Sequence, residues 1–161
     1  MPARTYIETT IVSYLTSRPS GDPLSRAHQE VTREWWLRRR SGFELYVSEV
    51  VLAEAERGDP TFAEARLRIV DGMPILKLTD RAKELAAAIL LSAALPKKAA
   101  ADAAHIAVAT VNSMDYLLTW NCTHIANAII LRKVNALCRQ LGYEPPTVCT
   151  PEELMEGEPS V

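Results

Sequence analysis

Short runs of apolar, β-branched and aromatic residues alternate along the chain with longer segments whose apolar positions recur at helical spacing. The short runs predict strands at residues 6–7, 43–47, 75–78, 116–120 and 147–150. The longer segments predict helices at residues 11–15, 24–40, 50–53, 61–70, 80–95, 99–112 and 125–141. Because short apolar strands alternate with helices throughout, we expect a three-layer α/β/α fold. Its central sheet should be mostly parallel, with about five strands, and covered on both faces.

Polar residues at the ends of these segments indicate where helices begin and end. We expect Thr9 or Thr10 to cap the first helix, because a short hydroxyl side chain accepts a hydrogen bond from a free backbone N–H. Ser48 and Thr79 are expected to cap the helices that follow the second and third strands. Gly42 fits the C′ position after the helix that ends in three arginines.

The size and charge of the chain favour a single globular domain. With 161 residues, 48% of them hydrophobic and 24% charged, the chain is predicted to form one domain over 1–161, with an acidic tail from about residue 152. Its net charge of −2 counts against a duplex DNA binder that works by bulk electrostatics. That balance does not exclude an enzyme that holds a metal ion against a nucleic-acid backbone.

Cysteine usage and hydropathy favour a reducing compartment. Cys122, Cys138 and Cys149 are odd in number and form no CxxC pair, which makes a disulfide framework or a zinc ribbon a poor interpretation. The N-terminus shows no signal-peptide hydrophobic region, and the longest apolar stretch, 85–95, is too short to span a bilayer. We therefore expect a cytoplasmic protein that does not enter a membrane.

Acidic and amide side chains gather where the predicted strands end. Glu8 follows the first strand, Glu54 lies about one helical turn beyond Ser48, and Asn121 follows the fourth strand. Asp102 lies in the first turn of the alanine-rich helix that precedes the fourth strand. Open parallel sheets carry their sites beyond the carboxyl ends of the strands, so these side chains are expected to converge. Grouped carboxylates need a cation, and oxygen ligands favour Mg²⁺ or Mn²⁺ over zinc.

At these residues the chain resembles the PIN domain, a metal-dependent nuclease fold that includes VapC-type toxins of toxin–antitoxin pairs. The matching motifs are, in chain order, Tyr6-Ile7-Glu8-Thr9-Thr10, Val47-Ser48-Glu49-Val50-Val51-Leu52-Ala53-Glu54, Asp102-Ala103-Ala104-His105-Ile106-Ala107 and Tyr116-Leu117-Leu118-Thr119-Trp120-Asn121. The resemblance extends from residue 6 to about 150, and it is the order of the motifs that makes it specific. The chain departs from the family at two positions, with Glu8 where aspartate is usual and Asn121 where aspartate is commoner. In the second respect it resembles a branch of the family that has asparagine at that position.

The resemblance implies a metal-dependent endoribonuclease, the toxin of a toxin–antitoxin pair. Glu8 and Asp102 would then bind the principal Mg²⁺ or Mn²⁺ ion, and Glu54 and Asn121 would complete a site for one or two ions, directly or through water. The metal would activate a water to hydrolyse an RNA phosphodiester. An antitoxin protein and a homodimer are the partners that the family implies.

Other polar residues near the expected site are candidates for substrate contacts. Thr9 or Thr10 could hold a water or a phosphate at the start of a helix. Lys97 and Lys98 precede the helix of Asp102 and are placed to meet an RNA backbone, and His124 is a candidate to touch phosphate or to position Asn121.

His105 is interpreted as a hydrogen-bonded packing residue, since it lies on an alanine-rich helix.

Two other functions fit the same residues. In the first, Asn121 marks a weakened metal site, and the chain is a catalytically weak or inactive PIN-fold module that binds RNA or protein. In the second, the acidic cleft belongs to a metal-dependent DNA nuclease or phosphoesterase. Metal binding, and a comparison of RNA, DNA and small phosphoester substrates, would discriminate between these functions.

Overall fold

The fold is a parallel five-stranded sheet in the order β3-β2-β1-β4-β5. It is seen in a computed structural model that describes residues 1–155. The strands are β1 (Ala3–Ile7), β2 (Phe43–Ser48), β3 (Ile75–Leu76), β4 (Tyr116–Leu118) and β5 (Thr147–Cys149). Every strand pair is parallel, which confirms the α/β class and the strand number expected from the sequence.

The strand order reverses at β1. The chain adds β2 and β3 on one side of β1 and then crosses over to add β4 and β5 on the other side. Ile7 therefore lies beside Leu118 at the carboxyl ends of two neighbouring strands that are far apart in sequence. In open α/β sheets the crevice beyond such a reversal is where ligands bind.

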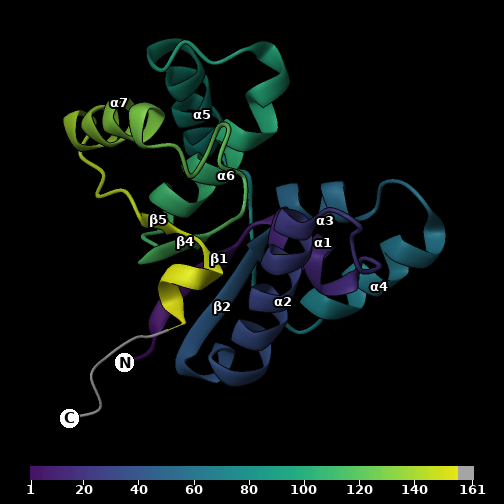
Figure 1. The fold of residues 1–161 in the computed structure, drawn as a ribbon. Helices are drawn as coiled ribbons and strands as arrows, with labels where there is room; N and C mark the ends of the chain where they lie inside the picture. Colours follow the sequence, from purple (N-terminus) through teal and green to yellow (C-terminus); the bar gives the residue numbers. More distant parts are fainter. Residues whose placement is uncertain (156–161) are drawn as a thin grey trace.

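Two groups of helices flank the sheet, as Figure 1 shows. The first group consists of α1 (Thr9–Thr16), α2 (Pro23–Arg38), α3 (Glu49–Ala55) and α4 (Pro60–Val70). The second group consists of α5 (Asp80–Ser92), α6 (Ala100–Val111) and α7 (Ala128–Gln140). Helices within each group pack on one another, and α3 also contacts α6 across the end of the sheet. Short 3₁₀ helices are η1 (Arg40–Gly42), η2 (Lys97–Ala99) and η3 (Pro151–Leu154).

Two of the predicted helix ends are wrong. The N-cap of α1 is Glu8 and not Thr9 or Thr10, because the Glu8 carboxylate accepts a hydrogen bond from the Thr10 backbone N–H in the first turn of the helix. Gly42 does not occupy a left-handed C′ position. Instead α2 ends at Arg38, and Gly42 closes the 3₁₀ turn η1. The predicted caps Ser48 and Thr79 are confirmed by their hydrogen bonds to backbone N–H groups of α3 and α5.

Several predicted segments are shorter in the structure. The helices expected at 80–95 and 24–40 end at Ser92 and Arg38, and the strand expected at 147–150 ends at Cys149. The strand expected at 75–78 ends at Leu76, the strand expected at 116–120 ends at Leu118, and residues 125–127 are not helical. At the C-terminus the expected acidic tail begins in an ordered segment, since Glu152 lies in η3. The rest of that tail, 156–161, lies outside the described residues.

The core lies between the sheet and both helix groups. Tyr6 and Ile7 of β1 and Leu117 and Leu118 of β4 are fully buried, and Trp35 of α2 is the largest fully buried side chain. Helix α6 presents small side chains over most of its length, which lets it lie close to the sheet and brings its polar residues near the strand ends. Within residues 1–155, no helix has the length and apolar character needed to cross a membrane.

Candidate metal centre

Glu8 lies where β1 leaves the sheet, and its carboxylate is held by hydroxyl groups. The residue is 3% exposed. Its Oε1 atom accepts hydrogen bonds from Thr10 Oγ1 at 2.6 Å and from Thr119 Oγ1 at 2.5 Å. Its Oε2 atom accepts from the Thr10 backbone N–H at 3.1 Å. Both the start of α1 and the end of β4 therefore fix the orientation of this carboxylate.

Glu54 comes to the same place from α3, the helix that Ser48 caps. Its Oε1 atom accepts from Thr9 Oγ1 at 2.6 Å and lies 2.5 Å from Nε2 of His105. Burial opposes ionisation of Glu54, but the hydrogen bond from His105, with help from Thr9 and the charge of Arg57, outweighs it and holds the pKa of Glu54 below its ordinary value. The carboxylate is thus stabilised as an anion.

His105 is fully buried on α6 and acts as a donor to Glu54. A contact of 2.5 Å between Nε2 and a carboxylate oxygen requires a hydrogen on that nitrogen. Its Nδ1 atom lies 2.6 Å from the Tyr6 hydroxyl, which lies 2.7 Å from Oγ of Ser48. The geometry agrees with the sequence interpretation of His105 as a hydrogen-bonded packing residue, and it adds a task, that of positioning Glu54.

Tyr6 completes this buried chain of polar groups. Burial raises the pKa of the Tyr6 hydroxyl well above its ordinary value, with a smaller contribution from the charge of Glu8, so the hydroxyl stays protonated. A protonated hydroxyl can donate to the unprotonated Nδ1 of His105, which leaves the ring hydrogen on Nε2, facing Glu54. The hydrogen bonds from Ser48 through Tyr6 and His105 to Glu54 are therefore all consistent with one tautomer of His105, the one with its hydrogen on Nε2.

Asp102 forms a second group with Asn121 and His124. Oδ1 of Asp102 accepts from Nδ2 of Asn121 at 2.9 Å, and its Oδ2 lies 2.9 Å from Nδ1 of His124. Oδ1 of Asn121 accepts from the His124 backbone N–H at 3.1 Å. The loop after β4 therefore presents an amide and an imidazole that orient the Asp102 carboxylate.

Thr119 joins the two groups into one crevice. Its hydroxyl donates to Glu8 at 2.5 Å and accepts from the Asn121 backbone N–H at 2.9 Å. On α6, Asp102 and His105 are three residues apart, which places them on one face of the helix. The four acidic and amide residues expected from the sequence, Glu8, Glu54, Asp102 and Asn121, thus lie around the carboxyl ends of β1 and β4.

The donor set of the crevice fits a divalent cation. Carboxylate oxygens of Glu8 and Glu54 and a ring nitrogen of His105 lie within 4.8 Å of one another. Both His105 nitrogens are already hydrogen-bonded, to Tyr6 and Glu54, so the ligands that this group offers are its two carboxylates. In the described part of the chain, the ion pairs of Glu8, Glu54 and Asp102 are with histidines alone and never with a lysine or an arginine. Carboxylates gathered in this way are costly unless a cation neutralises them, and oxygen donors suit Mg²⁺ or Mn²⁺.

The other predicted contact residues divide into two sets. The Thr9 and Thr10 hydroxyls lie in the crevice, where Thr9 donates to Glu54 and Thr10 donates to Glu8. Lys97 and Lys98 lie on the exposed surface of η2. Among the described residues, no hydrogen bond or ion pair joins these lysines to the acidic group.

Sequence reasoning missed the parts that Tyr6 and Thr119 play in the crevice. Tyr6 lies two residues before Glu8, and side chains at that spacing share one face of a strand. Thr119 lies two residues before Asn121 and was regarded only as part of the strand motif. The spacing of these pairs was the available signal, but it does not show which hydroxyl meets which carboxylate.

Three solved structures have a fold similar to that of this chain. VapC20 of Mycobacterium tuberculosis, described as a sarcin-ricin loop cleaving toxin, has a TM-score of 0.58 and 17% identity over 74% of this chain and 91% of that one. A chain of VapBC2 from Rickettsia felis, bound to a promoter DNA fragment, has a TM-score of 0.58 and 13% identity over 91% of this chain and 98% of that one. A chain of FitAB bound to the IR36 DNA fragment has a TM-score of 0.60 and 17% identity over 96% of this chain and 99% of that one.

The similarity is one of structure. No protein-family model matches the chain, and no curated protein matches it in sequence. At identities of 13% to 17%, the three solved structures establish a common fold.

Proposed function

Since the chain has the PIN fold that these solved structures share, we propose that it is a divalent-metal-dependent nuclease that hydrolyses RNA phosphodiesters. We further propose that it is the toxin of a toxin–antitoxin pair, bound by an antitoxin protein and forming a homodimer. The neighbouring VapC20 is described as a sarcin-ricin loop cleaving toxin, which supports the cleavage of nucleic acid. The VapBC2 and FitAB structures are complexes of an antitoxin with a chain of this fold, bound to DNA fragments. They support an antitoxin as the protein partner of this chain.

The observation that carries this proposal is the convergence of Glu8, Glu54 and Asp102. They come from three segments that are distant in sequence, and they meet beyond the ends of β1 and β4, where the strand order reverses. A carboxylate that only stabilises the fold does not need other carboxylates beside it. We propose that these three carboxylates, which hydroxyl, amide and imidazole groups orient, hold one cation together.

Each residue of the crevice has a distinct task in this mechanism. A bound Mg²⁺ or Mn²⁺ ion would supply an activated water and would neutralise charge on the phosphate. Glu8 and Asp102 would hold it, and Glu54 and Asn121 would complete the site directly or through water. His105 holds Glu54 through Nε2, and Thr119 holds Glu8.

The test is cleavage of RNA by the purified protein with Mg²⁺ or Mn²⁺ and with a chelator. We expect cleavage only with metal, and we expect Asp102→Ala to lower the rate by about 100-fold or more, because the loss of one ligand weakens both metal binding and charge stabilisation. Asp80→Ala is the matched control, since Asp80 is also a first-turn acid, on α5, and is exposed. Equal cleavage by wild type and Asp102→Ala would refute the mechanism.

The same preparation separates the substrate classes. RNA, single-stranded DNA and a small aryl phosphodiester are incubated side by side with the metal present. Preferential hydrolysis of RNA is expected. Preferential hydrolysis of DNA or of the small ester would instead identify a DNA nuclease or a phosphoesterase. Metal binding without hydrolysis of any of them would identify a binding module.

A further inference from the structure

A basic cavity is lined by α1, α4 and the segment that follows α3, and these segments neighbour residues of the acidic crevice along the chain. It has a volume of about 560 Å³. Its lining includes two hydroxyl residues of α1, an aromatic ring of α4 and three arginines, which are Ser13, Thr16, Phe62, Arg18, Arg57 and Arg66. Its single acidic lining residue, Asp59, uses its carboxylate to cap α4, where Oδ1 accepts from the Thr61 backbone N–H at 2.8 Å.

Two arginines of this cavity have contacts that hold them in place, and within residues 1–155 none of the three forms an ion pair. Nε of Arg66 donates to the Ala55 carbonyl at 3.0 Å, and its Nη2 donates to the Arg57 carbonyl. The guanidinium of Arg18 lies over the Phe62 ring, 5.5 Å from its centroid. Within residues 1–155, the arginines that form ion pairs with acidic side chains are others, namely Arg26, Arg38, Arg68 and Arg139. The positive charge of the cavity is therefore available to an anion.

Two segments connect the cavity to the acidic crevice. Arg57 follows Glu54 by three residues, and its charge contributes to the lowered pKa of Glu54. Ser13 follows Thr9 by four residues on α1, so the two lie on one face of the helix, and Thr9 itself donates to Glu54. A strand that lies across the acidic crevice can thus continue along α1 into the cavity.

We infer that the cavity formed by Arg18, Arg57 and Arg66 is a phosphate subsite that holds the backbone of a nucleic-acid strand next to the phosphodiester being cleaved. The inference rests on the proposed function, because it names how that same site would hold its substrate. Guanidinium groups match phosphate oxygens with paired N–H donors, and phosphate contacts set the position of a strand without reading its sequence. The subsite also offsets the repulsion that the neighbouring carboxylates exert on a polyanion.

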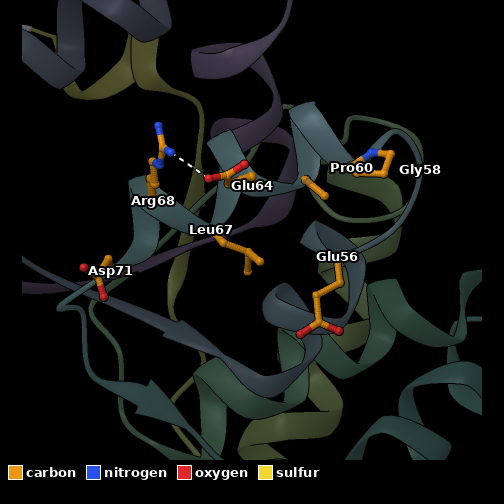
Figure 2. A pocket seen from close by; sticks show the side chains of 8 residues that line it. Glu56, Gly58, Pro60, Glu64, Leu67, Arg68 and Asp71 are labelled. Carbon is orange, nitrogen blue, oxygen red and sulfur yellow. Dashed lines mark hydrogen bonds and ion pairs between the residues drawn. The ribbon is translucent and has the colours of Figure 1, made fainter.

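The opposite face of α4 provides a matched control. There another cavity, which shares Gly58 with the basic one, is lined by Glu56, Glu64, Leu67, Arg68 and Asp71, as Figure 2 shows. In that cavity Arg68 pairs with Glu64 at 2.6 Å, so its charge is already neutralised. Arg68 and Arg66 lie two residues apart on the same helix but face different cavities. Replacing Arg68 thus removes the same type of side chain without touching the proposed subsite.

The experiment measures the affinity of the full chain for a fluorescein-labelled single-stranded RNA of about 12 nucleotides by fluorescence anisotropy. A chelator prevents cleavage, and the repulsion by the carboxylates is common to all variants. We expect Arg18→Ala and Arg57→Ala each to weaken binding by about threefold to tenfold and to reduce the slope of log K against log salt by about 0.7, the value for one phosphate contact on a single strand. Arg68→Ala is expected to change neither quantity.

The possible results separate this inference from the proposed nuclease. A salt slope that is unchanged in both Arg18→Ala and Arg57→Ala, an equal loss in Arg68→Ala, or no binding by the wild type would overturn the subsite. Melting curves of each variant show whether a loss of binding reflects unfolding. Metal-dependent cleavage together with unchanged salt slopes would leave the nuclease in place and remove the subsite. Arginine-dependent binding without cleavage would do the reverse.

Discussion

At the scale of single residues, uncharged hydroxyl groups and histidines decide how the carboxylates are presented. Glu8 is oriented by Thr10 and Thr119, and Glu54 is oriented by Thr9 and His105. These hydrogen bonds orient the carboxylates, and within residues 1–155 no lysine or arginine forms an ion pair with them that would compete with a metal ion. The same groups therefore stabilise the fold and leave the negative charge of the crevice unneutralised.

Loss of the His105 side chain should destabilise the fold. His105→Ala leaves the buried Tyr6 hydroxyl with one partner fewer and removes a donor from Glu54. We expect a decrease of about 1–3 kcal/mol in the free energy of unfolding, measured by urea denaturation. His105→Gln keeps an N–H donor and should recover part of the loss. An unchanged midpoint for His105→Ala would contradict the geometry of this hydrogen-bonded chain.

The three cysteines should differ sharply in reactivity. Cys122 is exposed, while Cys138 and Cys149 are buried. Burial raises the pKa of both buried thiols, that of Cys149 to about 12, so these two remain protonated near neutral pH. A thiol-reactive chromophore should therefore label one cysteine rapidly in the folded protein and all three in denaturant. Rapid labelling of more than one thiol in the folded state would contradict the described burial.

At the scale of elements, short helices bring the functional residues to the end of the sheet. Helix α3 has seven residues and is too short to be stable alone, so its cap and its packing hold it in place. Ser48 caps α3 and also contacts the Tyr6 hydroxyl, so one side chain both starts the helix and supports the crevice. The position of Glu54 depends on this element as a whole.

Two cap substitutions test that dependence. Ser48→Ala and Thr79→Ala each remove an N-cap, from α3 and α5, and each should lower stability by about 1 kcal/mol. Only Ser48→Ala should also lower metal-dependent cleavage, because α3 carries Glu54 whereas α5 carries no crevice residue. Unfolding curves and cleavage rates are measured on both variants. An equal loss of cleavage in Thr79→Ala would point to a general effect of stability.

At the scale of the whole molecule, the small net charge of −2 conceals a separation of charge. The strand order brings carboxylates together at the ends of β1 and β4, and a cavity of α1 and α4 carries three arginines that form no ion pair within residues 1–155. Net charge alone argued against a nucleic-acid partner. The local arrangement instead predicts that a cation in the crevice reduces its repulsion of a polyanion and so strengthens the binding of nucleic acid.

Divalent ions should therefore stabilise the folded protein. Any ligand that binds only the folded state raises stability, by about 2.7 kcal/mol at a concentration 100 times its dissociation constant. We expect Mn²⁺ or Mg²⁺ to raise the melting temperature of the wild type and of Glu49→Gln, whose exposed side chain lies outside the crevice. Glu8→Gln should abolish this rise, because it removes a charged ligand. An equal rise in Glu8→Gln would place the metal elsewhere.

Much of the fold could be predicted from local sequence patterns, and the predictions that were wrong have local causes. The caps Ser48 and Thr79 were predicted correctly, because each is a short hydroxyl side chain directly before an apolar helix. The cap of α1 was missed because glutamate is a poor cap by propensity, and Glu8 takes this role only because Thr119 and Thr10 hold its carboxylate in place. Gly42 was misplaced because a 3₁₀ turn competes with the left-handed glycine ending.

The sequence by itself determined the parallel α/β architecture and the set of acidic and amide residues at the strand ends. Both follow from short-range rules, since hydrophobic period sets the element type and parallel strands end on one side of the sheet. Only the tertiary structure decided that His105 supports Glu54, that Asn121 and His124 hold Asp102, and that three arginines line one cavity. These contacts join residues from separate elements, and their distances depend on how helices pack across the sheet, which local sequence does not specify.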